Sequence, residues 1–232
     1  MLTFTPIASG STGNCYRLEN GTDTLILEAG LHIRSIQEGF DFKLSEVAGC
    51  LSTHFHADHS KSLGKLMALS VPCYVTRGTA DALKLTGHRL HIIEAGKQFA
   101  VGSFTVMPFE VEHDCPGAVG FLIASGNDRL LFVTDSYFIR QKFRGLTMIA
   151  VECNYDSDIM AANVDAGLYP VAARDRVYGA HMSLATCKEF LQAQDLSKVE
   201  AIYLLHLSDA NSDAEGFKKQ VEELTGVPVE VA

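Results

Sequence analysis

The sequence lacks any long hydrophobic run. No apolar stretch approaches the length of about 18 residues that a membrane-spanning helix requires. The first residues, MLTFTPIASGSTGN, contain no basic segment followed by an apolar one, as a secretory signal would. We therefore expect neither a membrane partner nor a targeting segment. The composition, 47% hydrophobic and 20% charged, is that of a globular chain able to bury a core.

Closely spaced cysteines are also missing. The six cysteines are spread along 232 residues without a C-x-x-C pair. A chain of this length does not depend on disulfides for its stability. We expect reduced thiols and a cytoplasmic protein.

Basic residues are scarce. Lys and Arg number 19 against 28 Asp and Glu, which gives a formal net charge of -9. Proteins that coat nucleic acid draw most of their affinity from Lys and Arg on phosphates, so the charge disfavours this class. An enzyme that acts on phosphates is not excluded, because bound divalent cations reverse the local charge of a site.

Short apolar segments broken by turn residues occur in both halves of the chain, without a low-complexity linker or a charge block. They predict strands at residues 2–7, 15–19, 24–28, 47–52, 72–76, 90–94, 103–112, 118–124, 129–134, 148–153, 200–205 and 227–231. Helices are expected near residues 32–39, 60–69, 79–85, 183–193 and 213–224. Asn20-Gly21 and Gly126-Asn127 predict hairpin turns, and Ser212 and Asp213 a helix N-cap. The expected architecture is one domain over residues 1–232, of α/β (α+β) class, with two packed sheets and outer helices.

The stretch THFHADH at residues 53–59 holds three of the nine histidines. It follows the strand-like VAGCLS and precedes a helical pattern, which places it on a strand-to-helix loop. On an extended segment His54, His56 and Asp58 would share one face and His59 another, so one loop could supply two metal ions. Imidazole and carboxylate are ligands of zinc, iron and manganese. A cluster of solvated surface histidines is the alternative interpretation.

Three further residues, all of types that bind metal ions, lie at the ends of apolar strands. His113 closes FTVMPFEVEH, Asp135 closes RLLFVTD and His206 follows AIYLL. Singly, His113 could be a core histidine and Asp135 the N-cap of a helix over SYFIRQKF. All three at strand ends indicate a site, because open sheets bind ligands beyond the carboxyl ends of their strands.

In their order along the chain, THFHADH, His113, Asp135 and His206 resemble the metal-binding motifs of the metallo-β-lactamase-fold hydrolases. The resemblance spans nearly the whole chain. It implies a four-layer αββα sandwich of two mixed β-sheets with a dinuclear metal centre, zinc being the first expectation and manganese or iron the alternatives. By position, it assigns His54, His56 and His113 to the first metal, Asp58, His59 and His206 to the second, and Asp135 to a bridge.

Four further stretches, ASGSTGN, ECNYDSD, GAHMS and LLHLSDAN, look like the YycJ/VicX-like branch of that family. The branch implies a phosphodiesterase or exonuclease acting on nucleic acid. In ASGSTGN, Ser11, Thr12 and Asn14 could present hydroxyls and amides to an anion, or could simply make a tight loop.

The chain departs from the family pattern at two places. Glu28 stands where the fold usually has an aspartate, and we expect it to orient a ligand histidine from behind. In GAHMS the usual Gly-His-Leu-Ser-Asn is only partly kept, and His181 is expected near the substrate. Arg174, Arg176 and Ser183 are the accompanying substrate-binding candidates; for the arginines an exposed charged loop is an equal alternative.

The mechanism that follows is metal-assisted hydrolysis of a phosphodiester by a metal-bridging hydroxide. Asp58 is the expected proton acceptor for the attacking water, and His181 a donor to a phosphoryl oxygen. An acyl or thioester hydrolase on the same fold is one alternative. A non-hydrolytic redox or sensor module is another, although the chain has no room for a flavin domain.

The stretch SYFIRQKFRG, residues 136–145, interleaves aromatic and basic residues, as grooves for single-stranded nucleic acid do. The same residues also read as an amphipathic helix with Phe138 and Ile139 packed inward, which is the favoured interpretation.

Overall fold

The computed structural model describes residues 1–232. The chain divides into two compact units, Met1–Glu110 with Cys115–Arg129 and Val111–Asp114 with Leu130–Ala232. No helix in either unit combines the length and apolar character needed to cross a bilayer. All six cysteines are buried and none is in a disulfide.

The first unit contains a six-stranded mixed sheet in the order β1-β2-β3-β4-β5-β6. β1, β2 and β3 pair antiparallel, and β3 to β6 run parallel. The strands are β1 (Thr3–Ala8), β2 (Cys15–Glu19), β3 (Thr24–Leu27), β4 (Val47–Leu51), β5 (Cys73–Thr76) and β6 (Leu90–Ile93). Short helices connect the parallel strands, as such connections require: α1 (Ile33–Gly39), η1 (Leu44–Glu46), α2 (Ala57–Ser60), α3 (Leu63–Ala68) and α4 (Arg77–Ala82).

A hydrophobic core lies between this sheet and its helices. Ile26, Cys50 and Val75 from the strands pack with Ile36 of α1 and Leu66 of α3. The sequence therefore folds here as expected, with apolar strand residues covered by the apolar stripe of each helix. The unit also holds the antiparallel strands β7 (Phe99–Val101), β8 (Phe104–Glu110) and β9 (Val119–Ser125).

The second unit is built on four parallel strands: β10 (Asp128–Val133), β11 (Met148–Glu152), β12 (Ala201–Leu205) and β13 (Val229–Val231). β10 belongs to this unit from Leu130 onward. β10, β11 and β12 are almost continuously buried, which is typical of parallel strands covered on both faces. The strands from β7 to β13 follow the order β13-β12-β11-β10-β9-β8-β7 in a second mixed sheet. Two mixed sheets with flanking helices agree with the predicted class.

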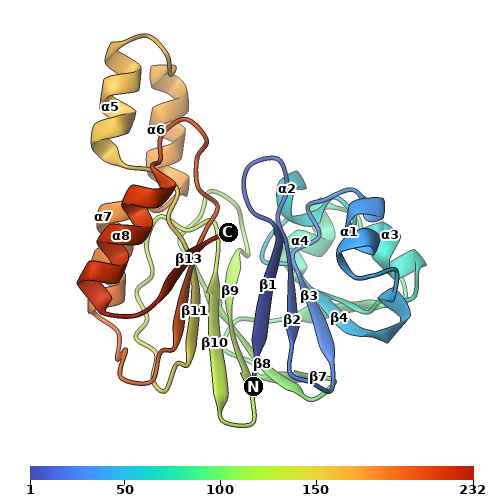
Figure 1. Ribbon diagram of the computed structural model, residues 1–232. Helices are drawn as coiled ribbons and strands as arrows, with labels where there is room; N and C mark the ends of the chain where they lie inside the picture. Colours follow the sequence, from blue (N-terminus) through green and yellow to red (C-terminus); the bar gives the residue numbers. More distant parts are fainter. The chain divides into compact units, whose positions relative to one another are not determined.

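Four helices belong to the second unit: α5 (Ser157–Asp165), α6 (Val171–Ala180), α7 (Leu184–Gln192) and α8 (Ala214–Thr225). α8 packs against β13 and α7, and α5 packs against α6 (Figure 1). Asp213 caps α8 by accepting a hydrogen bond from Gly216 N at 3.1 Å, as the sequence suggested.

The predicted strands and helices of both units are present, with boundaries shifted by up to three residues. η1, β7, α5 and α6 were not predicted. Met160 is the buried residue of α5 and Ala180 that of α6, so neither helix carries the apolar stripe by which a helix is read from sequence. Arg174 and Arg176 therefore lie on a helix, and the charged loop considered for them is wrong.

The helix favoured for residues 136–145 is also wrong. The segment is irregular, Ile139 is buried, and Phe138 is 44% exposed rather than packed inward. Asp135 consequently caps no helix. The earlier residues 60–69 form a helix that is interrupted, with α2 beginning inside the THFHADH stretch.

Three polar residues at strand ends adopt a left-handed backbone. Glu28 follows β3 with φ 63°, Asp135 comes two residues after β10 with φ 46°, and His206 follows β12 with φ 56°. Such conformations are uncommon for residues other than glycine and gather at functional sites. At each of these places the chain turns sharply off its strand and leaves a buried polar side chain at the strand's carboxyl end.

Gly30 fixes the approach of three segments in the first unit. Its N–H donates to Asn14 O at 2.9 Å, and Asn14 N–H donates to Asp58 O at 2.7 Å. A Cβ on Gly30 would lie 1.6 Å from that Asp58 oxygen. Only glycine permits this approach, so the position of the THFHADH loop depends on the absence of a side chain here.

We predict that Gly30→Ala lowers the free energy of unfolding by about 3 kcal/mol, because backbone must move to admit the methyl group. Urea unfolding followed by circular dichroism measures the change.

Gly64→Ala is the matched control in the same unit. A Cβ there meets nothing closer than Leu85 Cδ2 at 3.9 Å. Since Gly64 lies in α3, its replacement should stabilise by up to about 1 kcal/mol. A Gly30→Ala protein as stable as wild type would contradict the account of the loop.

Candidate metal centre

The THFHADH loop is held by its own hydroxyl groups. Ser52 Oγ donates to the carbonyls of His54 and His59, each at 3.2 Å. Ser60 Oγ lies 2.8 Å from Phe55 O and 2.9 Å from His56 O. These bonds satisfy carbonyls of a loop that leaves a buried strand, so its backbone is fixed before any ligand binds.

Three imidazoles of this loop cluster. The ring centroids of His54 and His56 are 4.7 Å apart, and those of His54 and His59 are 4.3 Å apart. His59 Nε2 lies 3.2 Å from Asp58 Oδ2. The extended face expected from the sequence is replaced by a helical turn, because α2 starts at Ala57 and supplies Asp58 and His59.

Neighbouring polar groups orient these rings. Thr53 Oγ1 lies 2.9 Å from His54 Nδ1, and Glu28 Oε1 lies 3.5 Å from His59 Nδ1. Both Glu28 and His59 are fully buried. Glu28 thus stands behind a candidate ligand histidine, where its longer side chain still reaches the ring.

Asn14 is a structural member of the site. It is fully buried, and its Oδ1 accepts from Gly10 N–H at 2.9 Å and from the Tyr16 hydroxyl at 3.1 Å. Its Nδ2 lies 3.0 Å from His59 Nε2. Ser11 and Thr12 are exposed in the same turn. The structure therefore gives Asn14 the tight-loop role, and leaves only the two hydroxyl residues open to solvent.

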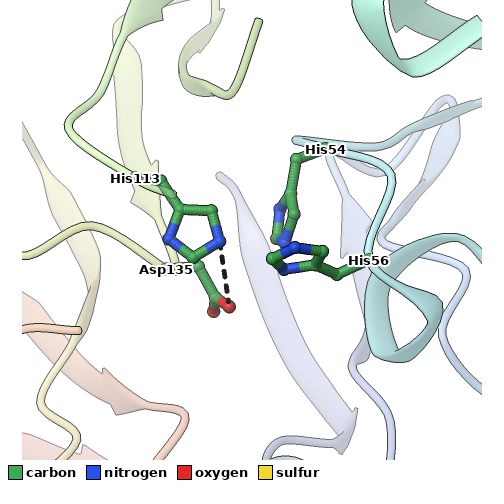
Figure 2. Close-up of side chains that lie close together, drawn as sticks. All are labelled: His54, His56, His113 and Asp135. Atoms are coloured by element: carbon green, nitrogen blue, oxygen red, sulfur yellow. Dashed lines mark ion pairs between the residues drawn. The ribbon is translucent and has the colours of Figure 1, made fainter. Parts of the chain in front are cut away.

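The second unit brings His113, Asp135 and His206 together. His113 Nε2 is 3.9 Å from Asp135 Oδ2, the ion pair marked by the dashed line in Figure 2. His206 Nδ1 is 3.7 Å from the other oxygen, Asp135 Oδ1. Each carboxylate oxygen of Asp135 thus faces a different imidazole.

The rings of this unit are oriented in the same manner. His113 Nδ1 lies 3.0 Å from Ala180 O, and Asn154 Nδ2 lies 3.1 Å from His206 Nδ1. Asn154 Nδ2 also donates to His206 O at 2.6 Å. Metal-binding histidines are held in this way, with one ring nitrogen against a carbonyl, amide or carboxylate.

Glu152, at the end of β11, is a site residue that the sequence analysis quoted but to which it gave no role. It is fully buried, and its Oε2 accepts from the N–H groups of Ser136 at 2.8 Å and Met182 at 3.1 Å. Its Oε1 lies 2.6 Å from His181 Nδ1 and 3.4 Å from His206 Nδ1. The signal was present, since a carboxylate closing an apolar strand is the pattern that singled out Asp135.

His181 follows α6 and joins this cluster. Its ring stacks on His206 with centroids 5.2 Å apart, and one polar atom from each of Asp135, Glu152, His181 and His206 lies within 4.8 Å of the others. Burial alone would lower the pKa of His181, but the Glu152 carboxylate raises it above the ordinary value. Burial alone would raise the pKa of Glu152, yet the two histidines hold it lower. Both shifts favour the ionised form of the pair, a carboxylate beside an imidazolium.

The remaining substrate-binding candidates have structural partners. Ser183 is buried and caps α7, its Oγ accepting from Thr186 N–H at 3.1 Å. Arg174 donates to Asp175 at 2.7 Å and lies over the Tyr178 ring. Arg176 Nε is 3.7 Å from Asp114 Oδ2, and its side chain is largely exposed.

The atoms of both units that could bind a metal suit a divalent ion. Each set combines imidazole nitrogen with carboxylate oxygen, the ligand types of zinc, manganese and iron. Their rings are already oriented by neighbouring groups, as found around bound metals.

Comparison with known proteins gives a family. The model of the beta-lactamase superfamily domain matches residues 28–207. The chain is 26% identical over 234 residues to exodeoxyribonuclease YycJ of Bacillus anthracis, covering 96% of this chain and 89% of that protein. It is 26% identical over 223 residues to exodeoxyribonuclease WalJ of Streptococcus pneumoniae, covering 89% and 81%.

A solved structure shows the same fold. The metallo-beta-lactamase fold protein YhfI of Bacillus subtilis superposes with a TM-score of 0.76 at 16% identity, over 100% of this chain and 95% of that one. The likeness agrees with the two mixed sheets and flanking helices seen here, and with the predicted fold class. The chain therefore belongs to the β-lactamase superfamily of metallo-β-lactamase-fold proteins, in its YycJ-like branch.

Proposed function

We propose that this protein is a dinuclear-metal-dependent phosphodiesterase with exonuclease-like action on single-stranded nucleic acid. Two relatives named exodeoxyribonuclease, aligned over most of their lengths, support the substrate class. The donor sets described above support a metal-dependent hydrolase of this superfamily.

The proposed ligand sets are those that the family resemblance assigns. His54 and His56 would hold one ion together with His113, and Asp58 and His59 would hold the other together with His206. Asp135 would bridge the two. Zinc is the expected metal, with manganese or iron as alternatives.

The observation that carries this proposal is the position of Asp135. Its two oxygens face different histidines, at 3.9 Å from His113 Nε2 and 3.7 Å from His206 Nδ1. Both separations are too long for direct hydrogen bonds. The separation from His113 Nε2 leaves room for a cation. His206 Nδ1 is already held by Asn154 Nδ2 at 3.1 Å, so His206 would bind an ion through its other ring nitrogen, Nε2.

The chain's own residues supply positioning and proton transfer. When bound, the ions would lower the pKa of a water molecule and polarise a phosphoryl oxygen. Asp58, whose carboxylate is 24% exposed, would accept the proton of the attacking water. His181, whose pKa Glu152 raises, would donate a proton through Nε2 to the leaving oxygen, in place of the donation to a phosphoryl oxygen expected from the sequence.

The first test compares wild type with His56→Ala. We expect about two metal ions per chain in wild type by elemental analysis, and hydrolysis of both bis-p-nitrophenyl phosphate and a labelled single-stranded oligonucleotide. Loss of one imidazole should lower the metal content and reduce both activities by at least about a hundredfold.

His88→Ala, which replaces an exposed histidine of the same unit, is the control and should leave metal content and activity unchanged. Wild type that holds metal but cuts neither phosphodiester under zinc or manganese loading would sink the proposal. Thioester and redox assays would then decide between the other activities of the fold.

A second prediction tests whether His181 donates a proton to the leaving group or only orders the site. Because p-nitrophenolate leaves without protonation, His181→Ala should reduce oligonucleotide cleavage by about 100- to 10,000-fold and bis-p-nitrophenyl phosphate hydrolysis far less. Steady-state rates on the two substrates measure the ratio.

Glu152→Gln tests the same point, since it keeps an acceptor for Ser136 and Met182 but removes the charge that sustains the imidazolium. Its cleavage rates should show the same dependence on the leaving group. Equal losses on both substrates would instead mean that His181 only orders the site.

A further inference from the structure

An extended segment of exposed side chains follows Asp135 in the second unit. Every second residue from 138 to 144 is exposed, and those between are buried or half-buried. This period of two is that of an extended chain, so the exposed side chains lie along one edge. We call them the 138–144 strip: Phe138, Arg140, Lys142 and Arg144.

The backbone of the segment is tied down on its inner edge. Phe143 N–H donates to Gln194 Oε1 at 2.9 Å, and Gln194 Nε2 donates to Gln141 O at 3.5 Å. Gln194 is itself buried. At the other end Ser136 Oγ donates to Phe138 O at 2.8 Å. The strip is thus held in an extended form before a ligand arrives, which lowers the entropic cost of binding.

The strip is positive in a chain of formal net charge -9. It carries three basic residues, and no acidic residue occurs between positions 136 and 147, although Asp195 lies near enough to Arg144 for their charges to interact. Glu112 Oε1 accepts from Arg140 Nε at 2.7 Å, which positions this guanidinium and offsets part of its charge, and Glu112 O accepts from Tyr137 N–H at 3.0 Å. A local positive edge on an acidic protein favours a polyanion over other partners.

Aromatic rings stand at the end of the strip nearest Asp135. Phe138 is 44% exposed and Tyr137 is 39% exposed. Large exposed aromatics beside basic residues are the platforms on which unpaired bases stack. Phe138 is three residues from Asp135, so the chain allows a separation of at most about 11 Å between their Cα atoms.

We propose that the 138–144 strip binds the single-stranded nucleic acid that is the substrate of the proposed function. Arg140, Lys142 and Arg144 contact successive phosphates, and a base stacks on Phe138 next to Asp135. The strip would lead one strand to the site, and a duplex, whose bases are already stacked, would gain nothing from Phe138.

The test measures binding of a labelled, cleavage-resistant phosphorothioate single strand to the metal-loaded protein by fluorescence anisotropy at several salt concentrations. Lys142→Ala/Arg144→Ala should weaken binding about tenfold or more and reduce the slope of log affinity against log salt by about 1.4, or 0.7 per lost phosphate contact. Phe138→Ala should weaken binding at least about fivefold with an unchanged slope.

Lys218→Ala/Lys219→Ala removes two positive charges from α8, outside the strip, and is the matched control. Its affinity should stay within about twofold of wild type, since the effect is local. Thermal unfolding of each variant checks that it is folded.

The outcomes separate this proposal from the proposed function. Bis-p-nitrophenyl phosphate hydrolysis by wild type reports on the function alone. If wild type does not bind the strand, or the strip variants bind like the control, the strip proposal is overturned even where the enzyme cleaves phosphodiesters. If Phe138→Ala weakens duplex and single-strand binding equally, the stacking role is overturned.

Discussion

The second unit depends on a buried negative charge. Glu152 has no contact with solvent, and an isolated carboxylate in such a place would be strongly unfavourable. Two backbone N–H groups and the ring of His181, whose pKa the carboxylate raises, stabilise it. These partners come from the segments that follow β10 and α6, so satisfying one carboxylate draws both segments to the end of β11. Asp135 precedes Ser136 directly, and its position follows from this arrangement.

The first unit also buries an acidic residue, Glu28, but its loop is held mainly by neutral hydrogen bonds. Its loop is fixed by carbonyl groups that accept from serine hydroxyls and from backbone N–H groups, and by the close approach of Gly30 to Asp58. Glu28 stands behind His59, as Glu152 stands behind His181 and His206. Both units therefore surround their histidines with polar groups that fix ring orientation.

Sequence reasoning found the parts of the molecule that have strong periodic or positional signals. The buried strands appeared as apolar runs, and His113, Asp135 and His206 appeared because polar residues rarely close such runs. α5 and α6 were missed because they bury almost nothing. The segment after Asp135 was misread as a helix, since its apolar residues suit several periodicities and only the side-chain exposures reveal the period of two. The amide of Asn14 and the hydroxyl of Ser183 make hydrogen bonds within a loop and at a helix end, contacts that only coordinates reveal, and their substrate-binding roles stay predictions.

The carboxyl end of α6 performs two tasks within two residues. Ala180 O lies within hydrogen-bond distance of His113 Nδ1. The next residue, His181, lies within hydrogen-bond distance of Glu152. Each residue in a helix turns the chain by about 100°, so inserting or deleting one inside α6 would rotate both groups away from their partners together. The turn between α5 and α6 does not position either of these groups. Over evolutionary time, changes of length in this helical hairpin should accumulate at the turn, while α6 itself keeps its register to the residue.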